Sequence, residues 1–503
     1  MQDTLKEHPS LLRRIFPYIL IIALIAFPLF VSLDTLPIRL WDEARNADNA
    51  FEMCESTNWL VTTYNKSPDM WNTKPPLLIW IQAFFIKLIG AGELAIRLPS
   101  AIAALLTCVA LLIFCISYLK NKVLAFVVVL VLITTEGYVN GHSSRTGDFD
   151  ALLTLFTTIS LISFFLFLET KRLRFLYLFF TVLALGVLTK SVAALLILPG
   201  IILYIVWQKQ VFSLLKNKHF YYGFLLFLIP VVSFYLLREH YNPGYLKSVQ
   251  ENELGGRYLK TIENHKEDCW FYYDNIRNFD MKSWYLLIPC GMLLGIFSKE
   301  EKIKKVTLFS TFFIVTYFVV ISLAQTKLIW YTVPLFPFLA LLAARCIDFI
   351  YKTLENLSYF KNMLRYNIAP VLFLFLIVIN PYQRMIQKTY LPKEEKVAHD
   401  FYELSYFLKD VIKENKNVND YSLLFDDSRD GVLSFYKKIL ERKKINIKYG
   451  DYKVLKPGDV VATSQRHIKK YLENNYTYEI LENHKQVLVL KIKGSEAPLL
   501  TQK

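Results

Sequence analysis

Residues 11–35 read LLRRIFPYILIIALIAFPLFVSLDT. Two arginines precede an apolar run that extends from Ile15 to Leu33. A cleaved signal peptide would have a shorter apolar core that ends at a small-residue cleavage site, and this stretch lacks both features. We interpret it as an uncleaved membrane span with Arg13 and Arg14 on the cytoplasmic side.

Similar apolar runs recur up to about residue 385 of the 503-residue chain, of which 54% is hydrophobic. This composition is typical of a polytopic α-helical membrane protein, and we expect about 11–13 spans. The net charge of +15 is attributed to cytoplasmic loops. Nucleic acid is not expected as a partner, because no compact basic motif interleaved with aromatic residues stands out. The expected spans are 15–33, 98–118, 123–138, 150–168, 173–189, 191–207, 220–237, 284–298, 305–324, 328–349 and 366–384.

The charges of the loops predict the orientation. Short basic loops are expected in the cytoplasm by the positive-inside rule, and they are 169–174, 208–219, 298–305 and 351–365. Counting from a cytoplasmic N-terminus then places the loops 34–97, 139–149 and 238–283 outside, together with the tail. This count requires the short segment 75–90 to lie at the outer interface. The alternative is that 75–90 crosses and that a further span compensates.

The tail changes character from about residue 390. Short apolar runs of strand length alternate with helical patterns such as DGVLSFYKKILERK. We therefore divide the chain into a membrane domain, 1–390, and a small extracytoplasmic α/β domain, 391–503. Cys54 and Cys269 fall in the two large outer loops, and whether they pair is left open.

Unusual charges lie at the predicted outer face. The stretch RLWDEARNADNAF, 39–51, contains the adjacent carboxylates Asp42 and Glu43. On a helix their side chains diverge, so one can face a cavity while the other holds a neighbouring Arg or the helix start. Lys190 and Lys327 each lie between two apolar runs. Such lysines either reach the interface with their long side chains or meet an anion at membrane depth, for which a lipid phosphate is the obvious choice.

Several cofactor classes lack their motifs. The chain contains no GxxxxGK[ST], GxGxxG or HExxH pattern and no spaced set of cysteine and histidine ligands. The energy for a reaction would then come from an activated, lipid-linked phosphate substrate. No cofactor is assigned and no metal-ligand set is proposed, although the outer carboxylates leave a divalent metal ion open.

Several sequence blocks resemble those of a known family. DEARNADNAF, WNTKPPLLIW, ELAIRLPSAIAALL, SSRTGDFDALLTLF, GVLTKSVAALLILPG and TKLIWYTVPLFPFLALL follow one another through about 350 residues. In this order they resemble C-type membrane glycosyltransferases, in particular the aminoarabinose transferases of lipid A modification and the dolichyl-phosphate-mannose protein mannosyltransferases. The resemblance implies an inverting enzyme that takes a sugar from a polyprenyl phosphate. It also implies an active site at the periplasmic face of a bacterial inner membrane.

The resemblance also implies roles for individual residues. Asp42 matches the acidic residue of the first outer loop, with Glu43 as its partner, and Lys74 resembles the cation that holds the donor phosphate. Further donor-phosphate or pocket residues are Lys190, Arg257, Lys327 and Tyr331. Asp150 matches a later acidic position, with Asp148 close by. The remaining pocket candidates are Arg45 and Arg145.

One position departs from the pattern. The aminoarabinose transferases carry a Glu before the KPP block, where this chain has Thr73. The sugar and the acceptor therefore stay open among a lipid, a glycan and a protein. A polytopic transporter or flippase is the alternative function. It would more often show inverted repeats and helices broken at matching positions in two halves, which the sequence does not display.

Overall fold

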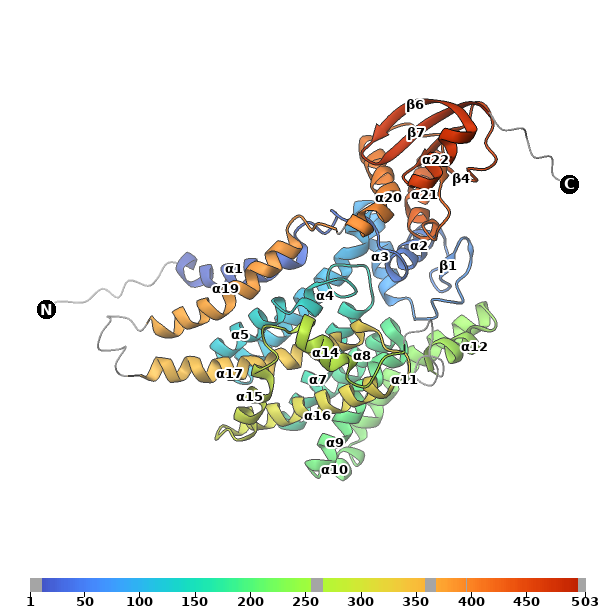
Figure 1. Cartoon of the computed structure of the whole chain (residues 1–503). Helices are drawn as coiled ribbons and strands as arrows, with labels where there is room; N and C mark the ends of the chain where they lie inside the picture. The colour runs from blue at the N-terminus through green and yellow to red at the C-terminus, as the bar shows by residue number, and fades with distance from the viewer. Residues whose placement is uncertain (1–10, 255–265, 358–367, 395, 496–503) are drawn as a thin grey trace. The chain divides into compact units, whose positions relative to one another are not determined.

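The computed structural model describes residues 11–254, 266–357, 368–394 and 396–495 (Figure 1). The chain divides into two compact units. Unit 1 comprises 1–33, 68–81 and 97–391, and unit 2 comprises 34–67, 82–96 and 392–503. The first outer loop is thus grouped largely with the C-terminal tail.

Unit 1 is helical. Its elements are α1 (Leu11–Phe30), α5 (Lys122–Ile133), α6 (Glu136–Val139), α7 (Asp150–Thr170), α8 (Leu173–Lys190), the 3-10 helix η1 (Ser191–Ile197), α9 (Leu198–Trp207), α10 (Val211–Leu215), α11 (Lys218–Tyr241), α12 (Tyr245–Val249), the π-helix η2 (Gln250–Leu254), α14 (Phe271–Asn275), the π-helix η3 (Ile276–Asp280), α15 (Leu287–Ile296), α16 (Glu301–Leu323), the 3-10 helix η4 (Ile329–Leu335), α17 (Phe336–Asn356) and α19 (Ala369–Thr389). Helices α3 (Leu77–Ile89) and α4 (Glu93–Ser117) contribute residues to both units.

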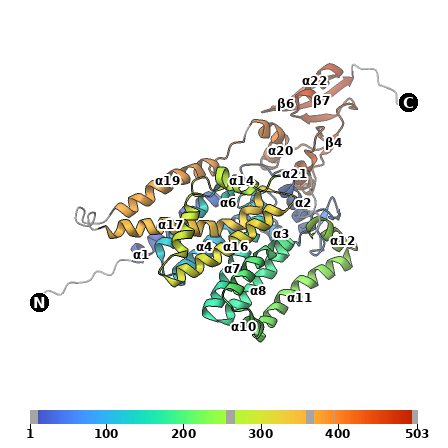
Figure 2. The ribbon, with the colours of Figure 1, turned by 60° about the horizontal axis from the view of Figure 1, so that its bottom comes forward.

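Within the described ranges, seven helices are long and apolar enough to cross a membrane. Four shorter apolar helices accompany them, namely α3, α5, α15 and the segment Ile21–Phe30 of α1. A helix of 21 residues such as α7 extends about 32 Å, which matches the hydrocarbon thickness. Figure 2 shows α7, α8 and α11 side by side, and α16 and α17 pack among the neighbouring helices.

Close packing of the helices depends on small residues at some contacts. A Cβ atom added to Gly291 of α15 would lie 1.7 Å from the carbonyl oxygen of Leu342 in α17. Only a glycine allows the two backbones to approach this closely.

Helix α8 ends directly after Lys190, where Ser191 has a φ of +47°. The sequence placed the boundary between two spans at this point.

Unit 2 contains α2 (Asp42–Glu55), the paired short strands β1 (Thr63–Tyr64) and β2 (Ser67–Pro68), and an α/β tail. The tail has α20 (Lys396–Glu414), β3 (Ser422–Leu424), α21 (Asp430–Arg442), β4 (Lys448–Gly450), β5 (Val460–Thr463), α22 (Arg466–Asn475), β6 (Tyr476–His484) and β7 (Val487–Ser495). Its sheet has the order β4-β3-β5-β7-β6. Strand β3 is parallel to β4 and β5, and β7 is antiparallel to β5 and β6.

Contacts inside unit 2 bind the first outer loop to the tail. The rings of Phe51 in α2 and Phe435 in α21 meet edge to face, with 6.2 Å between their centroids. The hydroxyl of Tyr436 donates to Glu93 at 2.8 Å and accepts from the backbone N–H of Ile38 at 2.9 Å. These contacts hold α2, which carries Asp42, and the segment before it against the tail. The thiols of Cys54 and Cys269 are both free, so the structure does not form the pairing that was left open.

Candidate active site

A cavity of about 280 Å³ lies in unit 1 and combines an apolar wall with four charged side chains. Its lining residues are Lys74, Asp150, Leu153, Lys190, Val192, Ala193, Leu196, Glu253, Tyr317, Val320, Ile321, Ala324 and Tyr331. They come from segments that are far apart in the sequence. Two ammonium groups beside many aliphatic side chains suit a ligand that is itself half anionic and half hydrocarbon.

The first ion pair of the cavity is short and buried. The ammonium of Lys190 donates to Oδ1 of Asp150 at 2.5 Å. Asp150 begins α7 and Lys190 ends α8. A carboxylate in the first turn of a helix is stabilised by the helix dipole. Lys190 also lies 5.7 Å from the ring centroid of Tyr331, within the range of a cation–π contact.

The second ion pair is longer. Nζ of Lys74 lies 3.8 Å from Oε1 of Glu253, and both side chains are largely buried. Lys74 also lies 5.5 Å from the ring centroid of Phe149. The same carboxylate oxygen of Glu253 accepts a hydrogen bond from Oγ1 of Thr73 at 3.4 Å. The hydroxyl of Tyr245 in turn holds the backbone of Thr73, donating to its carbonyl at 2.7 Å.

The adjacent carboxylates of α2 have different surroundings within unit 2. Glu43 is 1% exposed, and its Oε2 accepts the backbone N–H of Arg39 at 2.8 Å. This contact occupies Glu43 at the start of the helix. Asp42, the first residue of α2, is half-buried. Arg45 lies over the ring of Tyr64, 4.5 Å from its centroid.

Comparisons with known proteins give the same picture. The family model described as dolichyl-phosphate-mannose-protein mannosyltransferase matches residues 73–236. An undecaprenyl phosphate-alpha-4-amino-4-deoxy-L-arabinose arabinosyl transferase of Shewanella sediminis is 26% identical over 337 residues, which are 63% of this chain and 58% of the relative. An uncharacterized protein of Aquifex aeolicus is 24% identical over 353 residues, 68% of this chain and 66% of its own length. This chain therefore covers less than two thirds of the length of these curated relatives.

Solved structures agree in fold. The crystal structure of ArnT from Cupriavidus metallidurans bound to undecaprenyl phosphate superposes with a TM-score of 0.69 at 15% identity, covering 95% of this chain and 98% of that one. This chain is a homologue of these membrane glycosyltransferases. It is a multi-pass protein with their C-type fold. The predicted family resemblance and fold class are thereby confirmed.

Two further residues predicted for the site, Lys327 and Arg145, are not among the residues that line the cavity. Lys327 is buried, and its ammonium donates to the carbonyl of Ala324 at 2.8 Å. The guanidinium of Arg145 donates to the carbonyls of Pro28, Val31 and Thr389, which ties the end of α1 to the end of α19. Arg257 lies outside the described residues.

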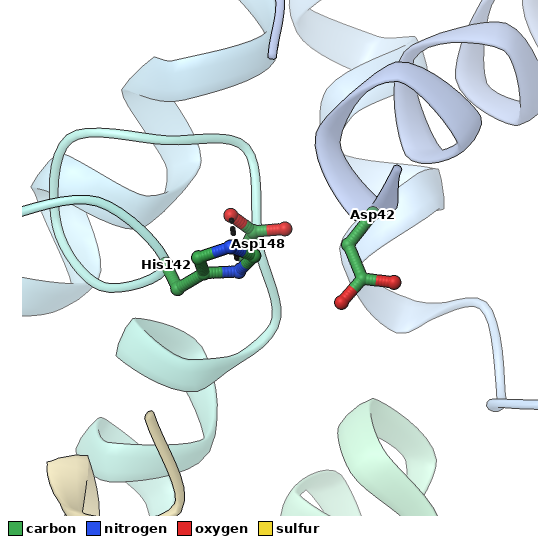
Figure 3. Close-up of side chains that lie close together, drawn as sticks. All are labelled: Asp42, His142 and Asp148. Carbon is green, nitrogen blue, oxygen red and sulfur yellow. Dashed lines mark ion pairs between the residues drawn. The ribbon is translucent and has the colours of Figure 1, made fainter. Parts of the chain in front are cut away.

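His142 and Asp148 lie together in the loop before α7. Nδ1 of His142 is 3.4 Å from Oδ2 of Asp148, the ion pair drawn in Figure 3, and the same oxygen accepts from the hydroxyl of Thr146 at 2.6 Å. The imidazole stacks on Trp330 with 3.7 Å between ring centroids. An imidazole and a carboxylate are both ligand types that divalent metal ions use.

Sequence reasoning did not single out Glu253, Phe149 or Tyr317. Glu253 stands in the stretch ENELGG, where three polar residues precede the leucine and glycines and no motif distinguishes one from another. Its place in the cavity is evident only from the structure, where η2 brings Glu253 close to Thr73 and Lys74. The one feature of the sequence that could have indicated Glu253 is that its carboxylate lies in the same predicted outer loop as Arg257.

Proposed function

We propose that this chain is a glycosyltransferase that takes a sugar from a polyprenyl phosphate. The acceptor is a lipid, glycan or protein at the outer face of the inner membrane. The cavity of unit 1 is the observation that carries this proposal, because its two lysines and its aliphatic wall match a phosphate attached to a prenyl chain. The name of the Shewanella sediminis relative refers to undecaprenyl phosphate and that of the matching family model to dolichyl phosphate, and both support the same class of donor.

In this proposal the cavity stabilises the leaving group. The bond between the anomeric carbon and the phosphate oxygen breaks, and negative charge grows on the phosphate. Lys74 and Lys190 would face that charge, and each charge-assisted contact contributes about 1.5–3 kcal/mol. Tyr331 keeps Lys190 in place through its ring. Arg257 and Lys327 stay proposed contributors to the same phosphate.

Asp42 is the proposed catalytic carboxylate. Direct displacement from the face opposite the phosphate inverts the anomeric carbon. If the acceptor is a hydroxyl, Asp42 takes its proton as the new C–O bond forms. If the acceptor is a phosphate, no base is needed and Asp42 orients the sugar. Glu43 serves the start of α2, consistent with its contact to the N–H of Arg39.

The positions of the two ends of α7 and α8 support an outer location of the cavity. Asp150 begins α7 and Lys190 ends α8, whereas the basic loop 169–174 joins the opposite ends of these two helices. The two ends of α7 are about 30 Å apart. If the basic loop is cytoplasmic, the cavity lies at the outer face.

A transfer assay with purified protein in detergent tests the function. We expect the protein to release polyprenyl phosphate from a polyprenyl-phosphate sugar when lipid, glycan and protein acceptors are supplied, with the sugar passing to the acceptor. Lys74→Ala should reduce turnover about 100-fold or more, because one transition-state contact is lost. Lys299→Ala, a change of the same kind at an exposed position, is the control and should retain wild-type turnover. Absence of release by the wild-type protein over a panel of sugar donors and of lipid, glycan and protein acceptors would overturn the proposal.

The same assay examines Asp42 and the metal ion. Asp42→Asn should reduce turnover about 100-fold or more if Asp42 is a base or steadies the sugar. Near wild-type turnover would remove Asp42 from the catalytic residues. Running each reaction with and without a chelator tests whether a divalent ion contributes, and restoration by added metal identifies it.

A further inference from the structure

Glu253 lies at the point of the cavity where the proposed donor phosphate would bind. Its Oε1 is 3.8 Å from the ammonium of Lys74 and 3.4 Å from the hydroxyl of Thr73. An ammonium and a hydroxyl are the donors that a phosphate oxygen would use. The carboxylate thus takes up interactions that a phosphate would need.

The two carboxylates of the cavity differ in how firmly they are held. Asp150 is 3% exposed, begins a helix of 21 residues and is 2.5 Å from its lysine. Glu253 belongs to a π-helix of five residues, Gln250–Leu254, and its lysine is 3.8 Å away. Short π-helical segments are rare and frequently occur at functional sites. If one carboxylate gives way to a ligand, it is Glu253.

The charge of the cavity supports such an exchange. Two lysines and two carboxylates bring the formal charge of these four groups to zero. A polyprenyl-phosphate sugar carries one negative charge, and the polyprenyl phosphate product carries nearly two at neutral pH. An additional anion in a cavity with an aliphatic wall is unfavourable unless another anion leaves its cation.

We propose that Glu253 is a resident anion that occupies the phosphate subsite when no lipid is bound and leaves Lys74 when the donor phosphate enters. This inference rests on the proposed function. Since carboxylate and phosphate compete for one ammonium, Glu253 weakens the binding of both donor and product. Its return to Lys74 would assist release of the polyprenyl phosphate, which otherwise binds more tightly than the donor because of its larger charge.

The test is the affinity of Glu253→Gln for undecaprenyl phosphate in detergent, with Glu251→Gln as the matched control. Glu251 lies in the same π-helix and is exposed. We expect Glu253→Gln to bind at least about threefold more tightly than the wild type, the size expected of a partly screened ion pair. Glu251→Gln should bind as the wild type does. In a Lys74→Ala background the gain should disappear, because the competition is for that ammonium.

Unchanged or weaker binding by a folded Glu253→Gln protein would overturn the inference, and weaker binding would make Glu253 a residue that helps to hold the lipid. The proposed function itself would be rejected, and the inference with it, by a result that differs from both of these. In that case neither the wild type nor any variant would bind undecaprenyl phosphate or release it from a donor.

Discussion

Each unit of the molecule contains a hollow lined by lysines, and the two hollows differ in how the lysines are neutralised. In the cavity of unit 1, Lys74 has the carboxylate of Glu253 at 3.8 Å. In unit 2, a pocket of about 670 Å³ is lined by α2, the β1–β2 segment, α21 and β4. There Lys438 lies 3.0 Å from Asp48 and 2.8 Å from Glu52.

The pair of carboxylates makes Lys438 a structural residue. Burial raises the pKa of Asp48, although the nearby ammonium of Lys438 acts in the opposite direction. Burial also acts against the charged form of Lys438, but Asp48 and Glu52 outweigh it and raise its pKa. Lys438 therefore joins α21 to α2 and has little capacity for a further anion. The comparison teaches that the number of carboxylates paired with a lysine, more than the presence of the lysine, distinguishes a binding site from a brace: Lys74 and Lys190 each have one in the cavity, and Lys438 has two.

Replacement of Lys190 has the largest expected effect. Lys190→Met leaves Asp150 buried without its closest cation, which destabilises the protein by about 3–5 kcal/mol. Transfer should also be lost, because a cation of the phosphate subsite is missing. Thermal unfolding in detergent and the transfer assay measure the two effects.

The double variant Lys190→Met with Asp150→Asn separates the two roles. Neutralising both partners should restore most of the stability, while transfer should stay at least about 100-fold below wild type. Recovery of transfer together with stability would mean that Lys190 is a structural residue like Lys438. The proposed difference between the two hollows would then not hold for Lys190.

Replacement of Lys438 has a smaller expected effect. Lys438→Met leaves Asp48 and Glu52 uncompensated, but the pocket is open enough to hydrate one of them, since the Glu52 side chain is 10% exposed. We expect a loss of about 2 kcal/mol in the free energy of unfolding and transfer within about twofold of wild type once the protein is folded. Loss of transfer in a variant of wild-type stability would show that the pocket of unit 2 takes part in the reaction.

The sequence predicted much of the fold from physical patterns. Apolar runs predicted the long helices, and alternation in the tail predicted β3, β4, β5 and β7. Strand β6 escaped notice because YTYEILENH mixes charged residues with a weak alternation, and its place in the sheet depends on pairing with β7. Helix α20 was not singled out either. The grouping of 34–67 with the tail depends on contacts such as Phe51 with Phe435, which local patterns do not contain.

The candidate site could be predicted from the sequence only in part. Lys74, Lys190, Asp150 and Tyr331 were each chosen from the sequence, and all four line one cavity. Their pairing was not predicted, because it depends on where α7 begins and where the turn at Ser191 ends α8. Glu253 was missed because its importance depends on its contacts with Lys74 and Thr73, which are far from it in the sequence.

A structure of the protein with undecaprenyl phosphate tests the central claim most directly. We predict that the phosphate lies within hydrogen-bonding distance, about 3 Å, of the ammonium groups of Lys74 and Lys190. The prenyl chain should follow the aliphatic wall, and Glu253 should have moved away from Lys74. A phosphate bound elsewhere, with the Lys74–Glu253 pair intact, would contradict the account.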